Sequence, residues 1–124
     1  MATEKILVVE DQYIIGMEIK DRLETLGYDV PAMVVSGEDA IGKTKELRPD
    51  LILMDIQLDG KLDGIEAAEQ ITTEFEVPII YLTAYSDYST LERAKKNVDS
   101  FLCLHKPFEE KELLSTIKQA LNPN

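Results

Sequence analysis

The chain has 124 residues, enough for one core without stapling bonds, and its single cysteine excludes an internal disulfide. A formal net charge of −11 argues against nucleic-acid binding, which needs a basic face, and is compatible with a divalent cation or a basic partner surface. We recognise no signal peptide, and no apolar run approaches the roughly 20 residues of a membrane span. We therefore expect one domain in the cytoplasm, where a lone cysteine stays reduced.

The apolar residues alternate between short unbroken runs, typical of buried strands, and a spacing of three to four residues, typical of helices. In chain order, these patterns predict a strand over 5–9, a helix over 15–26, a strand over 28–35, a helix over 36–47, a strand over 51–55, a helix over 63–75, a strand over 77–82, a helix over about 86–96, a strand over 101–104 and a last helix ending at 121. We expect residues 1–121 to form one domain, followed by a polar end at 122–124.

Local signals mark several of these boundaries. Pro31 favours an edge position for its strand, because proline cannot donate a hydrogen bond to a neighbouring strand. Ser36 with Asp39, and Asp63 with Glu66, match the capping-box pattern that opens a helix. We therefore expect helices to begin at both places.

Five alternations of strand and helix predict a parallel sheet covered by helices on both faces. In such a sheet the carboxyl ends of all strands lie along one edge, where ligands bind. The side chains expected to meet at this edge are Glu10, Asp11, Asp55, Thr83 and Lys106.

This group of side chains suits phosphoryl transfer. Three carboxylates at one edge repel one another unless a cation neutralises them, and Mg²⁺ prefers such oxygen ligands. A hydroxyl from Thr83 and an ammonium from Lys106 are suited to bind a phosphoryl group. Asp55 is then free to act as a nucleophile and to form an aspartyl phosphate.

With these residues, the chain resembles the receiver domain of two-component response regulators over essentially its whole length. The matching pieces are Val8-Val9-Glu10-Asp11, Leu53-Met54-Asp55, Asp63-Gly64, Tyr81-Leu82-Thr83-Ala84 and Lys106-Pro107-Phe108, in the order and spacing of that family. The resemblance implies a flavodoxin-like, doubly wound five-stranded parallel sheet in the order 2-1-3-4-5 with five helices. It also implies a signalling switch that assists its own phosphorylation and dephosphorylation, rather than an enzyme.

The resemblance further implies a role for each site residue. Asp55 would be the phosphoacceptor, and Mg²⁺ would be bound by Glu10, Asp11, Asp55 and the backbone carbonyl of Gln57. Thr83 and Lys106 would bind the phosphoryl group, and the bond between Lys106 and Pro107 would be cis. Gln57 and Tyr85 would flank the site. The implied partner is a histidine kinase or a phosphotransfer protein, and the output partner stays open, as does a homodimer formed on phosphorylation.

The chain departs from the family in two places. Asp59 stands where a proline usually follows the phosphoacceptor by four residues, and the loop to Asp63-Gly64 is one residue longer. Cys103 occupies the position of the family's switch aromatic, three residues before the lysine. On a regular strand Phe101 shares the face of Cys103, so we expect the aromatic half of the switch to be absent or displaced.

Three other functions are weighed against the phosphorylation switch. In the switch, phosphate on Asp55 draws Thr83 inward and changes the surface around residues 85–96 and 101–106. A flavodoxin-like electron carrier is disfavoured because Glu10-Asp11-Gln12 would repel a flavin phosphate. A phosphatase with an aspartate nucleophile would need Asp-x-Asp after the first strand. A pseudo-receiver that only binds a partner is disfavoured by the intact acids, threonine and lysine.

Overall fold

The computed structural model of the chain describes residues 3–58, 60–84, 92 and 102–122. Five parallel strands form one sheet in the order β2-β1-β3-β4-β5, as expected. The strands are β1 (Ile6–Val9), β2 (Met33–Val34), β3 (Leu51–Asp55), β4 (Ile79–Thr83) and β5 (Leu102–His105). The helices with bounds inside the described ranges are α1 (Tyr13–Thr25), α2 (Gly37–Leu47), α3 (Gly64–Glu74) and α5 (Glu110–Leu121). The fifth expected helix, over about 86–96, lies almost entirely outside the described residues.

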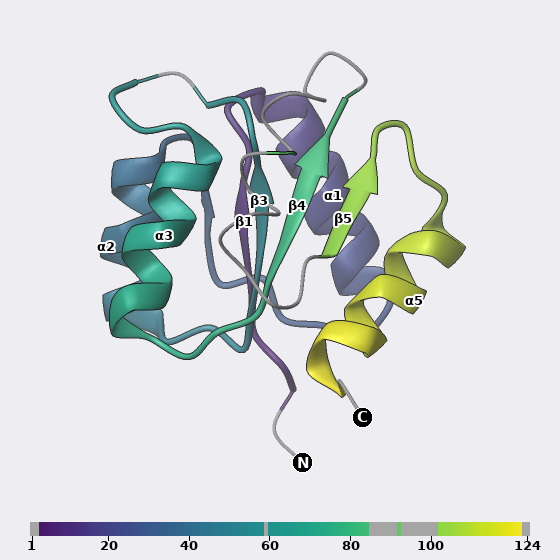
Figure 1. The fold of residues 1–124 in the computed structure, drawn as a ribbon. Helices are drawn as coiled ribbons and strands as arrows, with labels where there is room; N and C mark the ends of the chain where they lie inside the picture. The colour runs from purple at the N-terminus through teal and green to yellow at the C-terminus, as the bar shows by residue number, and fades with distance from the viewer. Residues whose placement is uncertain (1–2, 59, 85–91, 93–101, 123–124) are drawn as a thin grey trace.

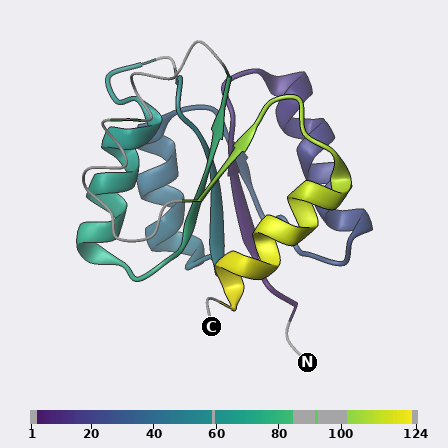
Figure 2. The same cartoon turned by 45° about the vertical axis from the view of Figure 1, so that its right-hand side comes forward.

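Helices cover the sheet on both faces, α1 and α5 on one and α2 and α3 on the other (Figures 1 and 2). The alternation of side chains along β1 feeds two separate cores. Leu7 and Val9 pack in the core beneath α2 and α3, whereas Ile6 and Val8 pack in the core beneath α1 and α5. Because all four side chains are buried, this strand reads as an unbroken apolar run.

The second strand is shorter than the predicted 28–35. It is reduced to Met33–Val34, with a separate bridge between Lys5 and Asp29. Pro31 lies between the bridge and the strand, and it has no N–H group with which to extend a ladder. The edge position that the proline predicted is confirmed, since β2 ends the sheet.

Both predicted helix starts are confirmed. The Ser36 hydroxyl accepts a hydrogen bond from Asp39 N at 3.1 Å at the start of α2. Asp63 and Glu66 form the complete reciprocal capping box of α3, with bonds of 2.8 and 3.0 Å. The first helix begins at Tyr13, two residues before the predicted start.

The alternation predicted for the last strand is also confirmed. Leu102 and Leu104 pack on the face of α1 and α5, whereas Cys103 packs on the face of α2 and α3. The pairing of β5 with β4 runs without interruption to Thr83 and His105, so no bulge displaces these side chains. Phe101 lies outside the described residues.

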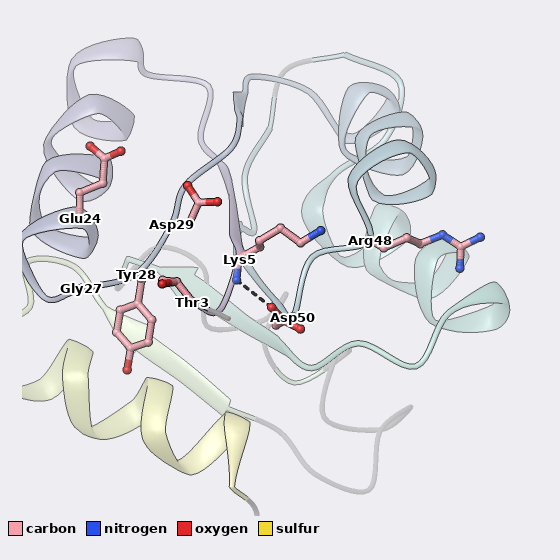
Figure 3. A pocket seen from close by; sticks show the side chains of 8 residues that line it. All are labelled: Thr3, Lys5, Glu24, Gly27, Tyr28, Asp29, Arg48 and Asp50. Carbon is pink, nitrogen blue, oxygen red and sulfur yellow. Dashed lines mark hydrogen bonds between the residues drawn. The ribbon is translucent and has the colours of Figure 1, made fainter. Parts of the chain in front are cut away.

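Polar groups in a hollow at the amino ends of the strands join neighbouring segments through hydrogen bonds (Figure 3). Lys5 N donates to a carboxylate oxygen of Asp50 at 2.7 Å, and Asp50 N donates to the Lys5 carbonyl at 2.8 Å. The Lys5 ammonium donates to the Leu47 carbonyl. These bonds fix where β1 and β3 begin, and thereby the register that aligns their carboxyl ends.

None of the described helices combines the length and the apolar composition that a membrane span requires.

The core between the sheet and α3 contains a titratable side chain, Tyr81, which is only 6% exposed. Burial, followed by the nearby charges of Glu69 and Asp63, raises the pKa of Tyr81 to about 12.

This pKa predicts an alkaline limit of stability. Between pH 10 and 12 the unfolded chain releases the Tyr81 proton while the folded chain keeps it, so we expect the free energy of unfolding to fall as pH rises through this window. The difference in phenolate absorbance between wild type and Tyr81→Phe, recorded against pH, measures this titration. A midpoint near 10 for the tyrosine removed by the substitution would contradict the prediction.

Candidate functional site

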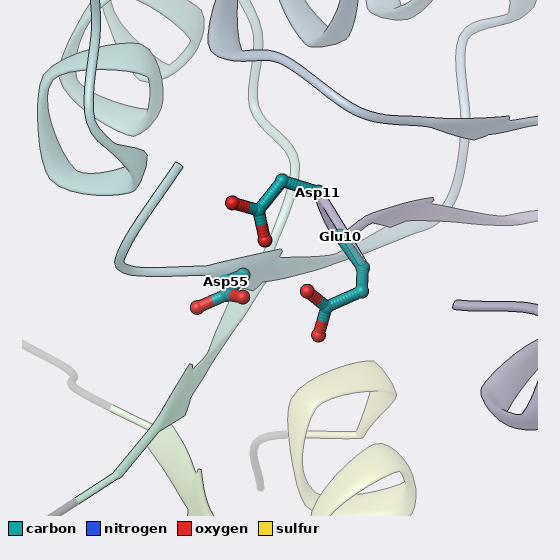
Figure 4. A group of neighbouring side chains, drawn as sticks. All are labelled: Glu10, Asp11 and Asp55. Carbon is teal, nitrogen blue, oxygen red and sulfur yellow. The ribbon is translucent and has the colours of Figure 1, made fainter. Parts of the chain in front are cut away.

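The carboxyl ends of the adjacent strands β1 and β3 bring three acidic side chains together. Val9 of β1 pairs with Met54 of β3, so Glu10, which follows β1, lies beside Asp55, which ends β3. One carboxylate oxygen each from Glu10, Asp11 and Asp55 lies within 4.8 Å of the others (Figure 4). Glu10 is fully buried and Asp55 is 5% exposed, so water alone does not solvate their charges.

A lysine that follows the edge strand β5 lies against these acids. The Lys106 ammonium donates to Glu10 Oε1 at 2.7 Å and to Asp55 Oδ2 at 3.1 Å. It follows β5, and its backbone N–H donates to the Thr83 carbonyl at 2.8 Å. The bond between Lys106 and Pro107 is cis, as predicted.

The site has an excess of negative charge. Burial, followed by the hydrogen bond with Asp55, raises the pKa of Glu10, although Lys106 opposes the shift. Burial and then Glu10 raise the pKa of Asp11. Burial lowers the pKa of Lys106, but its contacts with Glu10 and Asp55 more than offset that effect, so the pKa is raised. Three carboxylates therefore face one firmly charged ammonium, and a further cation would be stabilised here.

The residues fit a hard divalent cation. The acids provide oxygen ligands, which Mg²⁺ prefers, and the site opens into a cleft of about 540 Å³ that leaves room for water ligands. The residues that line this cleft are Asp11, Gln12, Ile15, Asp55, Ile56, Gln57, Leu58, Asp63, Ala84 and Lys106.

Not every predicted site residue reaches the cleft. Gln57 lines it, and its backbone N–H donates to Asp55 Oδ1 at 3.1 Å. Thr83 ends β4 at the same sheet edge, but it is fully buried and its hydroxyl donates to the Ala84 carbonyl at 3.1 Å. Tyr85 lies outside the described residues.

Two backbone features shape the site: the N–H group of Gln12, which no sequence pattern predicts, and the glycine of the Asp63-Gly64 motif. Gln12 N donates to Glu10 Oε2 at 3.1 Å and so fixes the buried carboxylate. A Cβ on Gly64 would lie 2.0 Å from the Asp55 carbonyl oxygen, so the start of α3 approaches the backbone of β3 as only glycine allows. This close approach is the physical reason for the glycine of the Asp63-Gly64 motif.

Comparison with known proteins decides the family. Residues 6–118 match the response regulator receiver domain family. The chain belongs to this family. Membership disfavours both the electron carrier and the phosphatase as functions of the chain, since each needs a different pattern of residues after the first strand.

Several relatives resemble this receiver domain over nearly all of its length. The transcriptional regulatory protein PdtaR of Mycobacterium tuberculosis is 31% identical over 118 residues, which cover 95% of this chain and 57% of PdtaR. The chain spans about half the length of the curated relatives it matches.

Two solved structures show the same fold. The signal receiver domain of a modulated diguanylate cyclase from Desulfovibrio desulfuricans G20 has a TM-score of 0.90 and 37% identity, covering 98% of this chain and 96% of its own. The receiver domain of the sensor histidine kinase PA1611 from Pseudomonas aeruginosa PAO1 has a TM-score of 0.85 and 33% identity, covering 97% and 98%. That second structure has a magnesium ion coordinated in its active site cleft.

The ion pairs predict what happens when the lysine is replaced. Lys106→Met leaves two buried carboxylates without their ammonium, so we expect the free energy of unfolding at neutral pH to fall by about 2–3 kcal/mol, less than for a fully buried pair. Without the ammonium, a buried carboxylate of the folded state binds a proton more tightly than it does in the unfolded chain. The loss of unfolding free energy should therefore shrink as pH falls. Added Mg²⁺ should also reduce it. Urea unfolding with and without Mg²⁺ measures both effects.

Lys20→Met provides the matched control. Lys20 pairs with Glu24 at 3.8 Å on the exposed side of α1, so its loss should change the free energy of unfolding by less than about 0.5 kcal/mol. Equal effects of the two substitutions would show that the Lys106 contacts are no stronger than surface ion pairs.

Proposed function

We propose that this receiver domain accepts a phosphoryl group on Asp55 from a histidine kinase or a phosphotransfer protein. The observation that supports it is the position of Asp55, at the sheet edge beside two further carboxylates and 3.1 Å from the Lys106 ammonium. In the transfer, a carboxylate oxygen of Asp55 forms a bond to phosphorus while the bond from phosphorus to the donor's histidine nitrogen breaks. The product is an acyl phosphate on Asp55.

Glu10, Asp11, Asp55 and the Gln57 carbonyl are the residues proposed to hold Mg²⁺. When bound, the cation would neutralise the acids and the charge of the incoming phosphoryl oxygens. Glu10 also holds the Lys106 ammonium at 2.7 Å, which keeps that charge next to Asp55. Gln57 N, bonded to Oδ1 of Asp55, orients the carboxylate relative to the cleft.

Phosphorylation is proposed to change the partners of two side chains. Lys106 would exchange its contact with Asp55 Oδ2 for a phosphoryl oxygen. The Thr83 hydroxyl would leave the Ala84 carbonyl for another phosphoryl oxygen, and we propose that the carboxyl end of β4 moves with it. This movement would change the surface near β4 and β5 that an output partner or a second copy reads. Cys103 supplies no aromatic ring at the position usual in the family, so the proposed change is assigned to Thr83 and Lys106.

A phosphorylation-independent interaction module is the second candidate. It is favoured by the Thr83 hydroxyl, which is buried and bonded to the Ala84 carbonyl rather than placed in the cleft. Uptake of phosphate by Asp55 distinguishes the two functions, because the interaction module needs none.

The nucleophile is tested with a small phosphodonor and Mg²⁺. We expect wild type to gain one phosphoryl group by intact mass, and Asp55→Asn to gain none, because an amide cannot form the acyl phosphate. Chelation of Mg²⁺ should prevent labelling of wild type. Asp39→Asn, which changes an exposed acid in the first turn of α2, should react at the wild-type rate. Labelling of Asp55→Asn at the wild-type rate would sink the proposal.

A further inference from the structure

We infer that Glu38, in the first turn of α2, positions the loop between β3 and α3 and thereby the Mg²⁺ site. Glu38 contacts none of the acids of the site in the bonds described above, so it acts through the loop. The inference rests on the proposed function, because that loop contains Gln57, one of the proposed Mg²⁺ ligands.

The Glu38 carboxylate binds the loop directly. Its Oε1 accepts a hydrogen bond from Leu62 N at 3.0 Å, across 24 residues of sequence. Its Oε2 lies 3.2 Å from the place that a Cβ on Gly60 would occupy. Gly60 has a φ of +110°, a conformation that favours glycine, so the loop bends closely around this carboxylate.

The backbone of α2 holds Glu38 in place for this contact. A Cβ on Gly37 would lie 3.0 Å from Leu62 Cβ and 3.2 Å from the Leu62 carbonyl oxygen, so the helix start is packed against the loop. The Ser36 hydroxyl caps the same turn through Asp39 N. An acidic side chain is also favoured here by the positive end of the helix dipole. The Glu38 side chain therefore projects from a helix start whose backbone is held by packing and by a cap.

The loop carries groups of the site at both ends. Near its start is Gln57, which lines the cleft and whose N–H is bonded to Asp55, and at its end is Asp63, which also lines the cleft. Gly64, the first residue of α3, donates from its N–H to the Ile56 carbonyl at 2.8 Å and so joins the two ends of the loop. Between them, the loop is one residue longer than usual and lacks the customary proline, with Asp59 in its place. A proline would restrict the backbone of the loop from within. Glu38 restricts it from outside.

Removing the acceptor should let the loop sample conformations in which the Gln57 carbonyl is not aimed at the cation. A hydrogen bond of this kind contributes enough to change affinity by about two- to tenfold. We therefore expect Glu38→Ala to weaken Mg²⁺ binding within this range. Glu38→Gln keeps a side-chain oxygen that can accept from Leu62 N, so its Mg²⁺ affinity should stay within about twofold of wild type.

The test is a calorimetric titration of MgCl₂ into the full chain as wild type, Glu38→Ala, Glu38→Gln and Asp39→Ala. Asp39→Ala removes a neighbouring exposed acid from the same helical turn and should leave the affinity unchanged. It therefore controls for loss of surface charge near the helix start. Circular dichroism at the titration temperature checks that each variant is folded.

The outcomes separate this inference from the proposed function. Wild type that binds no Mg²⁺ contradicts both. Wild type that binds while Glu38→Ala binds equally well overturns only the role of Glu38. A loss in Glu38→Gln as large as in Glu38→Ala, or an equal loss in Asp39→Ala, would assign the effect to charge and overturn the positioning role.

Discussion

The contact of the Lys106 ammonium with Glu10 and Asp55 is the interaction on which the rest of the site depends. A parallel sheet directs the carboxyl ends of its strands to one edge, and here the ends of the adjacent strands β1 and β3 carry acidic residues. Two of these carboxylates are almost completely buried, so they need a positive partner within the protein. Lys106 supplies it from the edge strand and thereby ties β5 to the centre of the sheet.

The same interaction explains why the site is suited to change state. One ammonium does not neutralise three carboxylates, so a further cation would be stabilised at the site. A phosphoryl group on Asp55 would offer the Lys106 ammonium a new hydrogen-bond acceptor. Thr83 is joined to this exchange through the backbone, since its carbonyl accepts from Lys106 N. On this account, rearrangement of the lysine and of the end of β4 are parts of one event. The loop fixed by Glu38 provides the stationary side of the site.

Much of this arrangement was predictable because its signals are local or follow from sheet geometry. The acids and Lys106 each lie at or just after the carboxyl end of a strand, and parallel pairing then brings them together. The caps at Ser36 and Asp63 follow short patterns. Other features depend on neighbours that no spacing identifies. The Thr83 hydroxyl turns to the Ala84 carbonyl, which is a choice of rotamer. The hydrogen bond from Leu62 N to the Glu38 carboxylate joins residues 24 positions apart, and no sequence pattern relates the two segments.

The central claim is that Asp55 accepts phosphate beside a cation held by the acids and Gln57. A crystal structure of the chain with Mg²⁺ and beryllofluoride, a mimic of the phosphoryl group, tests it most directly. We predict beryllium bonded to an Asp55 oxygen, Mg²⁺ bound among the carboxylates and the Gln57 carbonyl, and the Lys106 ammonium against a fluoride. Beryllofluoride on another residue, or a cleft without Mg²⁺ at saturating concentration, would contradict the account.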